Sequence, residues 1–489
     1  MNRRDFTKTM LAWSAAAPAV VTFQTVAQTA TSSAEAFHPE PARQLPVRRF
    51  EVVVAGAGTA GVVAAIAAAR QGARTLLVER KGYPGGTVTE GGTALHSYFN
   101  LWKAFPNVKK RQVVRGIPQE IIDRLARMGG TSGHAEMSAG YDYDSVCTAV
   151  DVELYKLAVW EMLEEAGVEV CVNTLLAGAI RDGARVKGVI LESRAGREAI
   201  YAQSFIDCTG FGDLAALGGA SFQEPNDYAV CNSIGLANVS LEKLHDFLKS
   251  RDAVEQLAVG QRSGREAQIV RIQGQPVAFA QEFREGLAAN GTSMVTTTVH
   301  DNYFMFVKVN YKMRVSPTNR DELSKAELEL RRRQFRTLEL FRKFVPGCEK
   351  ALIARTSPTL NIRRGRLIAC DYDLTHEDVI EGRHFDDDTF VYGFHDSAPR
   401  LQIKNGGTYG IPYRALCVKG IENLYAAGMM ITSDQRAHMS TRNTVSCMGQ
   451  GQATGTAAAL CARKRCGARD LKYAELRAAL EKGGVYFET

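Results

Sequence analysis

Cysteine clusters of the metal-binding type are missing from this 489-residue chain, although it contains ten cysteines. No C-x-x-C and no C-x-x-C-H motif occurs, so a c-type haem attached to the chain is excluded and a cysteine-ligated iron–sulfur cluster is disfavoured. Cys171, Cys208 and Cys231 lie in apolar or strand-like surroundings, which indicates small buried thiols. The sequence therefore predicts neither a metal site nor a second redox centre of its own.

A concentrated charge of one sign is also missing. The formal net charge is +7, which is mild for this length, whereas a nucleic-acid-binding protein carries a dense basic face. The one dense basic run, residues 330–344, combines Arg with Leu and Phe at helical spacing. That pattern predicts an amphipathic helix with a solvated basic face, and no nucleic-acid partner.

Long apolar runs are scarce, and one of them lies near the N-terminus. Residues 2–8 are net basic, residues 10–23 are apolar and alanine-rich, and residues 34–36 read A-E-A, as in a secretory signal. The apolar stretch is too short to be a good membrane span. Arg3 and Arg4, followed by Phe and Lys, resemble a twin-arginine signal. We expect residues 1–36 to direct export of the folded protein to the periplasm, with no membrane span after their removal.

A glycine motif between a strand and a helix is the main feature that is present. Residues 51–80 (EVVVAGAGTAGVVAAIAAARQGARTLLVER) predict a βαβ unit with Gly56, Gly58 and Gly61 where the first strand meets the helix. Gly56 permits the tight turn, Gly58 admits a pyrophosphate, and Gly61 lets the helix pack closely. Glu79 ends the second strand, where a carboxylate accepts hydrogen bonds from ribose hydroxyls. The motif by itself does not distinguish NAD from FAD.

Five further segments distinguish them: residues 82–92 (GYPGGTVTEGG), 205–220 (FIDCTGFGDLAALGGA), 362–379, 407–428 and 444–460. In this order they resemble the glutathione-reductase-like flavoprotein superfamily with its two dinucleotide-binding domains, and within it the family of FAD-dependent oxidoreductases. The resemblance implies FAD as the cofactor. It also implies cofactor contacts at Gly56, Gly58, Ala60, Gly61, Glu79, Gly86, Thr87, Val170, Gly210, Asp213, Gly428 and Gly451.

Some of these positions carry specific expectations. A helix beginning around residues 449–451 would direct N–H groups at negative charge on the flavin ring. Asp213 suits a ribityl hydroxyl or a water near the pyrophosphate, and Val170 lies on a short strand near which adenine would rest.

The expected fold class is α/β: a Rossmann-like FAD-binding domain with a small antiparallel sheet, and a second α+β substrate or cap domain. We expect the FAD-binding domain in residues 48–222 and 405–489, with the closing helix in the second part, and the cap domain in residues 223–404. In the cap we expect helices over 241–250 and 276–290, strands over 292–300 and 303–315, and a long basic helix after residue 324.

Candidate catalytic residues follow from their places in the chain. His438 lies between the last expected cofactor strand and the closing helix, so we predict that it takes a proton from the substrate near neutral pH. His96 and His395 are further candidates, and a structural role is the alternative for each histidine. Arg442 and Arg363 are candidates for holding an anionic substrate or the charge of reduced flavin, with surface ion pairing as the alternative.

The predicted function is an FAD-dependent dehydrogenase that oxidises a small organic substrate. It would pass electrons to an external acceptor such as a quinone, a cytochrome or oxygen. Two alternatives stay open: a periplasmic reductase of an activated C=C bond, and a non-catalytic flavin electron carrier.

Overall fold

A parallel sheet of five strands joins segments that are far apart in the sequence. The computed structural model divides the chain into Met1–Arg43 and a compact unit, Gln44–Thr489. It describes residues 40–92, 95–101, 111–136, 145–393 and 403–488, and the following concerns the second unit. The strand order is β24 (Leu424–Ala426), β12 (Ser204–Asp207), β2 (Val52–Ala55), β3 (Thr75–Val78) and β8 (Glu169–Cys171), with every neighbouring pair parallel. The predicted βαβ unit and the return of distant segments to it are confirmed.

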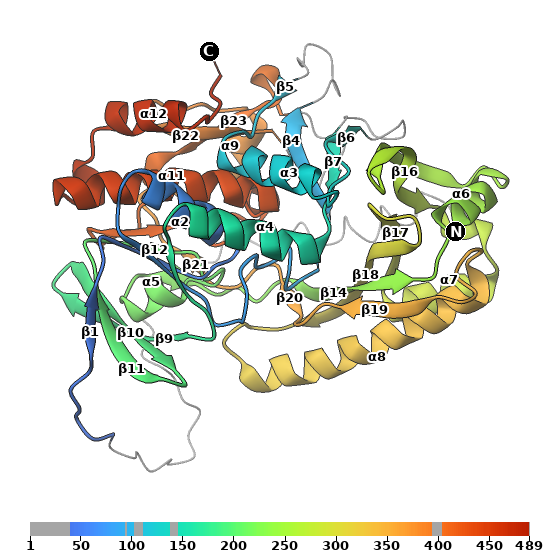
Figure 1. The fold of residues 1–489 in the computed structure, drawn as a ribbon, viewed down its shortest axis with the longest axis horizontal. Helices are drawn as coiled ribbons and strands as arrows, with labels where there is room; N and C mark the ends of the chain where they lie inside the picture. Colours follow the sequence, from blue (N-terminus) through green and yellow to red (C-terminus); the bar gives the residue numbers. More distant parts are fainter. Residues whose placement is uncertain (1–39, 93–94, 102–110, 137–144, 394–402, 489) are drawn as a thin grey trace, which may run out of the picture. The chain divides into compact units, whose positions relative to one another are not determined.

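Two helices cover one side of this sheet and pack very closely against each other (Figure 1). They are α2 (Thr59–Arg70) and α11 (Thr444–Lys464). A Cβ atom on Gly451 would lie 2.2 Å from the carbonyl oxygen of Ala60, and one on Gly455 would lie 2.1 Å from that of Ala64. The two backbones therefore approach as closely as only glycine allows.

The start of α11 corrects one prediction. The helix begins at Thr444, with Asn443 as its extended N-cap residue, and not around residues 449–451. Gly449 and Gly451 lie inside the helix, where they admit the ring of Phe390 and the backbone of α2. Asparagine is a favoured N-cap residue, whereas these glycines serve packing.

The predicted small antiparallel sheet is present. Its order is β1 (Val47–Arg49), β11 (Gly196–Tyr201), β10 (Arg185–Ser193) and β9 (Leu175–Asp182). Two tight turns join its three long strands, with Gly183 and Gly196 at positive φ. Strand β1 pairs in parallel with β11 and is the one parallel addition to this sheet.

A sheet of seven strands dominates the region assigned to the cap. Its path is β15 (Val254–Arg262), β16 (Arg265–Gly274), β17 (Thr292–Thr297), β18 (Tyr303–Arg314), β14 (Ala229–Ala237) and β19 (Leu352–Thr356), and β20 (Asn361–Ile362) pairs with β14. One face packs into a core with α6 (Leu241–Lys249), α7 (Gln281–Asn290) and α8 (Arg320–Phe344), seen at the right of Figure 1.

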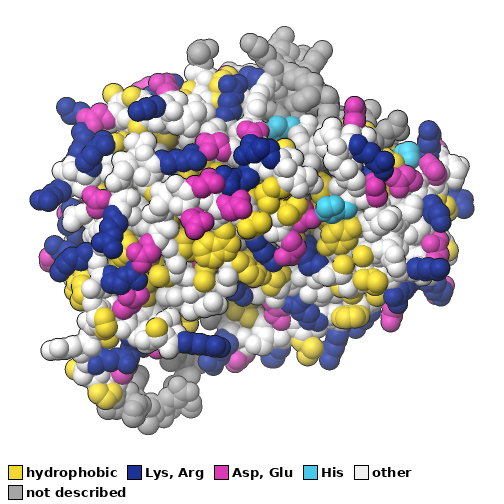
Figure 2. Space-filling model, viewed as in Figure 1, with side chains coloured by type: hydrophobic (Ala, Val, Ile, Leu, Met, Phe, Trp, Pro, Cys, Tyr) yellow, Lys and Arg dark blue, Asp and Glu magenta, His cyan; other side chains and the backbone are white. Residues whose placement is uncertain are grey.

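Most cap elements match their predictions. The helix expected over residues 276–290 is divided, because Phe279 is extended between a 3-10 turn, Pro276–Ala278, and α7. The basic run lies in α8, whose exposed side is rich in Lys and Arg (Figure 2). The domain boundaries themselves stay a prediction.

The other elements connect these sheets. A four-stranded sheet has the order β5 (Arg111–Gln112), β4 (Leu95–Leu101), β7 (Ser145–Ala149) and β6 (Ala135–Glu136). Two further strand pairs are β13 (Phe222–Gln223) with β21 (Leu367–Ile368) and β22 (Asp388–Tyr392) with β23 (Tyr409–Pro412). The remaining helices are α3 (Ile117–Arg127), α4 (Val152–Glu165), α5 (Asp213–Leu217), α9 (His376–Ile380), α10 (Gln435–Thr441) and α12 (Tyr473–Lys482). Within the described ranges, no helix is both long and apolar enough to cross a membrane.

Candidate functional site

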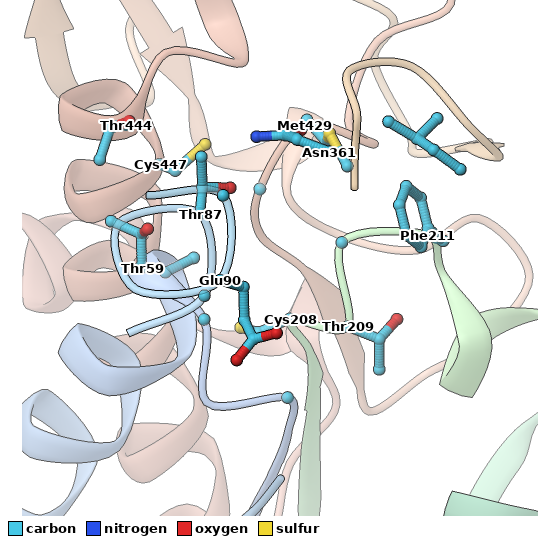
Figure 3. Close-up of a pocket in the computed structure, with 18 of the residues that line it drawn as sticks. Thr59, Thr87, Glu90, Cys208, Thr209, Phe211, Asn361, Met429, Thr444 and Cys447 are labelled. Carbon is cyan, nitrogen blue, oxygen red and sulfur yellow. The ribbon is translucent and has the colours of Figure 1, made fainter. Parts of the chain in front are cut away.

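A cavity of about 570 Å³ lies where the carboxyl ends of the parallel strands face the large sheet. Its walls come from the β2–α2 turn, from residues 86–91, 208–213, 359–363 and 427–429, and from the start of α11. Figure 3 shows Thr59 and Thr87 near Thr444 and Cys447, Glu90 toward Cys208, and Asn361, Met429 and Phe211 further along the wall. Ligands of open α/β sheets bind at this edge.

The three glycines of the motif, Gly56, Gly58 and Gly61, have different structural roles. Gly56 has φ +92°, and a Cβ on it would lie 2.5 Å from the carbonyl oxygen of Cys208. A Cβ on Gly61 would lie 1.8 Å from the carbonyl oxygen of Gly56, so α2 packs directly on the turn. Gly58 differs, because the nearest atoms to its Cβ position are 3.8 Å away and the residue lines the cavity. Its missing side chain leaves room for a ligand rather than for protein.

Glu79 lies at the cavity with both carboxylate oxygens hydrogen-bonded to backbone. The N–H of Ala57 donates to Oε2 at 2.8 Å, and the N–H of Lys81 donates to Oε1 at 2.9 Å. These bonds orient the carboxylate while each oxygen keeps a lone pair for a further donor. The geometry fits the predicted contact with ribose hydroxyls.

A second glycine loop lies against the first. A Cβ on Gly86 would lie 2.6 Å from the Cα of Gly58, and Gly86 and Thr87 both line the cavity. The N–H of Gly85 donates to the carbonyl of Ala57 at 2.8 Å. Ala60, in the first turn of α2, also lines the wall. Two backbone loops thus form a narrow cradle suited to phosphate groups.

The segment after β12 forms the opposite wall. Asp207 is buried and accepts hydrogen bonds from Thr209 and from the N–H of Ala215, and burial raises its pKa to about 6. It holds the turn that carries Gly210 and Asp213, both of which line the cavity. Asp213 pairs with Arg366 at 2.7 Å.

Gly428 and the start of α11 complete the walls. Gly428 has φ +131° and nothing within 4 Å of its Cβ position, and its N–H donates to Oε1 of Gln450 at 2.7 Å. Asn443, Thr444 and Cys447 line the cavity at the positive end of the α11 dipole. This end takes the role that had been predicted for Gly451, which packs on α2 instead.

These observations fit FAD. The open side of Gly58 suits the pyrophosphate, Glu79 suits the ribose, and the α11 N-terminus suits the flavin ring. The family model described as FAD dependent oxidoreductase matches residues 51–480. The chain belongs to this family. It is an oxidoreductase whose cofactor is FAD, whereas the assignment to the glutathione-reductase-like superfamily stays a prediction.

Individual relatives cover less of the chain. FixC of Escherichia coli strain K12 is 30% identical over 187 residues, which are 37% of this chain and 42% of FixC. A 3-oxosteroid 1-dehydrogenase of Mycobacterium tuberculosis is 37% identical over 75 residues, 15% of this chain and 12% of that protein. The chain thus matches well under half of the length of these relatives.

Solved structures resemble the fold weakly, as one example illustrates. The geranylgeranyl bacteriochlorophyll reductase-like protein of Thermoplasma acidophilum aligns with 89% of this chain and 83% of its own, at 14% identity and a TM-score of 0.46. That likeness supports no conclusion about function.

In this FAD-dependent oxidoreductase, the predicted catalytic residues have separate places. Arg442 and Arg363 line the cavity. The backbone of His96 lies on β4, but its side chain is outside the described residues, as is the whole of His395. Val170 lies on β8, at the edge of the parallel sheet, and is not among the described residues that line the cavity.

His438 is completely buried in α10, one helical turn before Arg442. Among the described residues no hydrogen bond of good geometry reaches either ring nitrogen, and the backbone of Met429 is the nearby group that favours the protonated ring. Burial holds the pKa of His438 well below its usual range, and the positive charges of Arg442 and Arg364 act in the same direction. His438 is therefore neutral at ordinary pH, but it is not among the described lining residues. Its role as a proton acceptor stays a prediction.

Sequence reasoning missed the wall formed by the large sheet. Arg271, Ser293, Val295, Phe306 and Lys308 line the cavity from β16, β17 and β18. In the register of these strands, Arg271 pairs with Thr297, which pairs with Phe306, so all three belong to one face. The alternation of side chains along each strand could have indicated which residues share a face. The local sequence does not indicate that this face lines the cavity.

Proposed function

We propose that this protein is a dehydrogenase that oxidises a small organic substrate by hydride transfer to FAD and then passes the electrons to an external acceptor. The observation that carries the proposal is the continuity of the cavity. One wall is the FAD cradle around Gly58, and another is the side-chain face of β16–β18. A substrate between them would lie against the flavin and out of bulk water.

The sheet face suits a molecule with an apolar body and a polar group. Val295 and Phe306 offer apolar contact, while Ser293, Arg271 and Lys308 offer hydrogen-bond donors. Neighbouring strands are about 4.8 Å apart, so side chains from three strands can touch one small ligand. Contacts of this kind would hold the reacting carbon of the substrate about 3–3.5 Å from the flavin.

Groups of the protein itself can stabilise negative charge that develops on the flavin during the reaction. FAD, when bound, supplies a hydride acceptor at its N5 atom. The N-terminus of α11 offers the unpaired N–H groups of its first turn, and Arg442 adds a full positive charge beside it. Together they stabilise negative charge that develops on the ring side of the cavity.

The direction of the reaction rests on a comparison. The short match to a 3-oxosteroid 1-dehydrogenase supports oxidation of the substrate rather than its reduction. The second wall, which faces the FAD side of the cavity, favours an enzyme over an electron carrier, whose flavin edge should be exposed to its partner. A quinone, a cytochrome or oxygen would accept the electrons.

Anaerobic mixing with a panel of small organic metabolites tests this proposal. A substrate should bleach the absorption of the oxidised flavin in a rapid, concentration-dependent step. If no compound reduces the flavin, but the chemically reduced protein is reoxidised by an activated alkene, the enzyme is a reductase. If neither reaction occurs and the reduced protein reacts only with protein acceptors, it is an electron carrier.

We also propose that the protein works in the periplasm. The support is the sequence of residues 1–36, with Arg3 and Arg4 ahead of an apolar stretch and A-E-A. A twin-arginine route suits a flavoprotein, because the fold closes around FAD in the cytoplasm before export.

A further inference from the structure

The C-terminal end of α11 has a geometry that brings two cysteines together. The N–H of Cys466 donates to the carbonyl of Cys461 at 3.1 Å, and the N–H of Arg465 donates to that of Ala462 at 3.2 Å. Arg465 is in the left-handed region with φ +55°. These two bonds with this φ define a Schellman motif, in which the side chains at the positions of Cys461 and Cys466 contact each other.

The distances suit a disulfide. The 3.1 Å hydrogen bond from Cys466 to Cys461, together with standard bond lengths, limits their Cα atoms to a separation of about 7.3 Å at most. Disulfides span Cα separations of about 4.4–6.8 Å. The Cys466 side chain lies close enough to Cys461 to contribute to the raised pKa of its thiol. Both cysteines are free thiols in this structure.

Exposure sets the order of reaction. Cys461 is buried at 1% exposure, whereas Cys466 is partly exposed. Burial raises the pKa of Cys461 to about 12, so its thiol attacks poorly by itself. Cys466 is therefore the residue that meets an oxidant first.

We propose that Cys461 and Cys466 are a modification site at which an external disulfide oxidises the pair to an intramolecular disulfide. The Cys466 thiolate attacks one sulfur of the oxidant, breaks its S–S bond and releases one thiol. The Cys461 sulfur then attacks the Cys466 sulfur, forms the new S–S bond and releases the second thiol. Two electrons and two protons pass from the cysteines to the oxidant, which is a small disulfide or a disulfide-exchange protein.

The cross-link would secure the end of the helix that faces FAD at its other end. Arg465 occupies a left-handed position that is unfavourable for a residue other than glycine, so contacts around it must hold the turn. The segment that follows is anchored by the N–H of Ala468, which donates to the carbonyl of Glu422 at 2.7 Å. A covalent bond between Cys461 and Cys466 would prevent this turn from unwinding.

The sequence between the cysteines makes the test sharp. Residues 463–465 are Arg, Lys and Arg, so trypsin separates the peptide that contains Cys461 from the peptide that begins at Cys466. The folded, FAD-loaded protein is incubated with oxidised glutathione, its remaining thiols are alkylated in denaturant, and the digest is analysed by mass spectrometry. We expect the two peptides to be joined, two fewer alkylated thiols, and an unfolding temperature higher by about 2 °C.

Two variants serve as controls. Cys466→Ser should abolish the joined peptides and the temperature shift. Cys447→Ser, which alters the other cysteine of the same tryptic peptide, should keep the joined pair, with the mass difference between sulfur and oxygen and without the alkyl group that Cys447 carries in the wild type. The proposal is overturned if both thiols are alkylated after treatment, if Cys466 stays linked to glutathione, or if Cys447 is the partner. The wild-type comparison decides even if a variant folds poorly.

Discussion

A side chain at Gly58 should remove FAD without unfolding the protein. The residue has φ −70° and ψ −171°, which any amino acid adopts, and its Cβ would meet Cys208 and Gly86 only at 3.8 and 3.9 Å. Alanine therefore costs the apo-protein little, and its unfolding free energy should change by less than about 1 kcal/mol. The remaining directions around the Cβ open into the cavity, where the pyrophosphate approaches the backbone.

The magnitude follows from crowding at that contact. One methyl group forced into a close-packed site costs about 1–3 kcal/mol, which raises the Kd for FAD by roughly 5- to 150-fold in Gly58→Ala. Gly58→Val adds two more carbons and should be purified without flavin. Titration of apo-protein with FAD, followed by flavin fluorescence, measures the first change, and the absorption of the purified protein measures the second.

Two matched glycines separate binding from folding. Gly178→Ala places a Cβ at an ordinary 3.5 Å from Ile190 on β10, away from the cavity, and should keep full flavin. Gly61→Ala places a Cβ at 1.8 Å from the backbone of Gly56 and should reduce folded protein and flavin together. A Gly58→Val protein with full flavin and an unchanged unfolding temperature would refute the reasoning.

Three further outcomes are expected. Glu79→Ala should weaken FAD binding by about 1–3 kcal/mol in the same titration, because it removes charge-assisted hydrogen bonds; an unchanged Kd would contradict the ribose contact. Replacing Arg3 and Arg4 by Lys should leave flavin-loaded protein in the cytoplasm, as measured by cell fractionation. An unchanged amount in the periplasm would contradict the twin-arginine route. In the wild type, the free energy of unfolding should fall below pH 6.5 by up to about 1.4 kcal/mol per pH unit, because His438 binds a proton in the unfolded state but not in the folded state. His438→Gln should remove this contribution, so that its free energy of unfolding falls less steeply with decreasing pH. Equal slopes for wild type and variant would contradict this.

Local patterns predicted well the strands, turns and loops that surround the cavity at Gly58. The βαβ unit, Glu79 and the loop at Gly86 depend on short-range signals: a buried strand, a glycine turn and a carboxylate at the end of the next strand. The closing helix was predicted correctly as a helix, but its start was misplaced by about five residues. Glycines attracted that prediction, whereas Asn443 was the better signal for the first turn.

The cavity wall formed by the large sheet could not be predicted in the same way. Arg271 and Phe306 line the same cavity because three strands align in register and one face of their sheet lies against it. The hairpin of β15 and β16, which carries Arg271, was not predicted at all. The register of the strands, and which part of the protein each sheet face packs against, depend on contacts between residues far apart in the chain. A short stretch of sequence contains no information on such contacts. His438 shows the same limit, since its place in the chain suggested contact with the ring but α10 buries it.

The contact between α2 and α11 makes the cofactor site sensitive to a remote position. Gly455 lies 11 residues into α11, about 16 Å along the axis from Thr444. A methyl group there would have to move the backbone of Ala64 from 2.1 Å to an ordinary contact, which separates the helices by more than 1 Å. Because both helices begin at the cavity and behave as stiff rods, that shift reaches the phosphate cradle and the flavin end together. A substitution at a residue that contacts no ligand would thus weaken the binding of FAD.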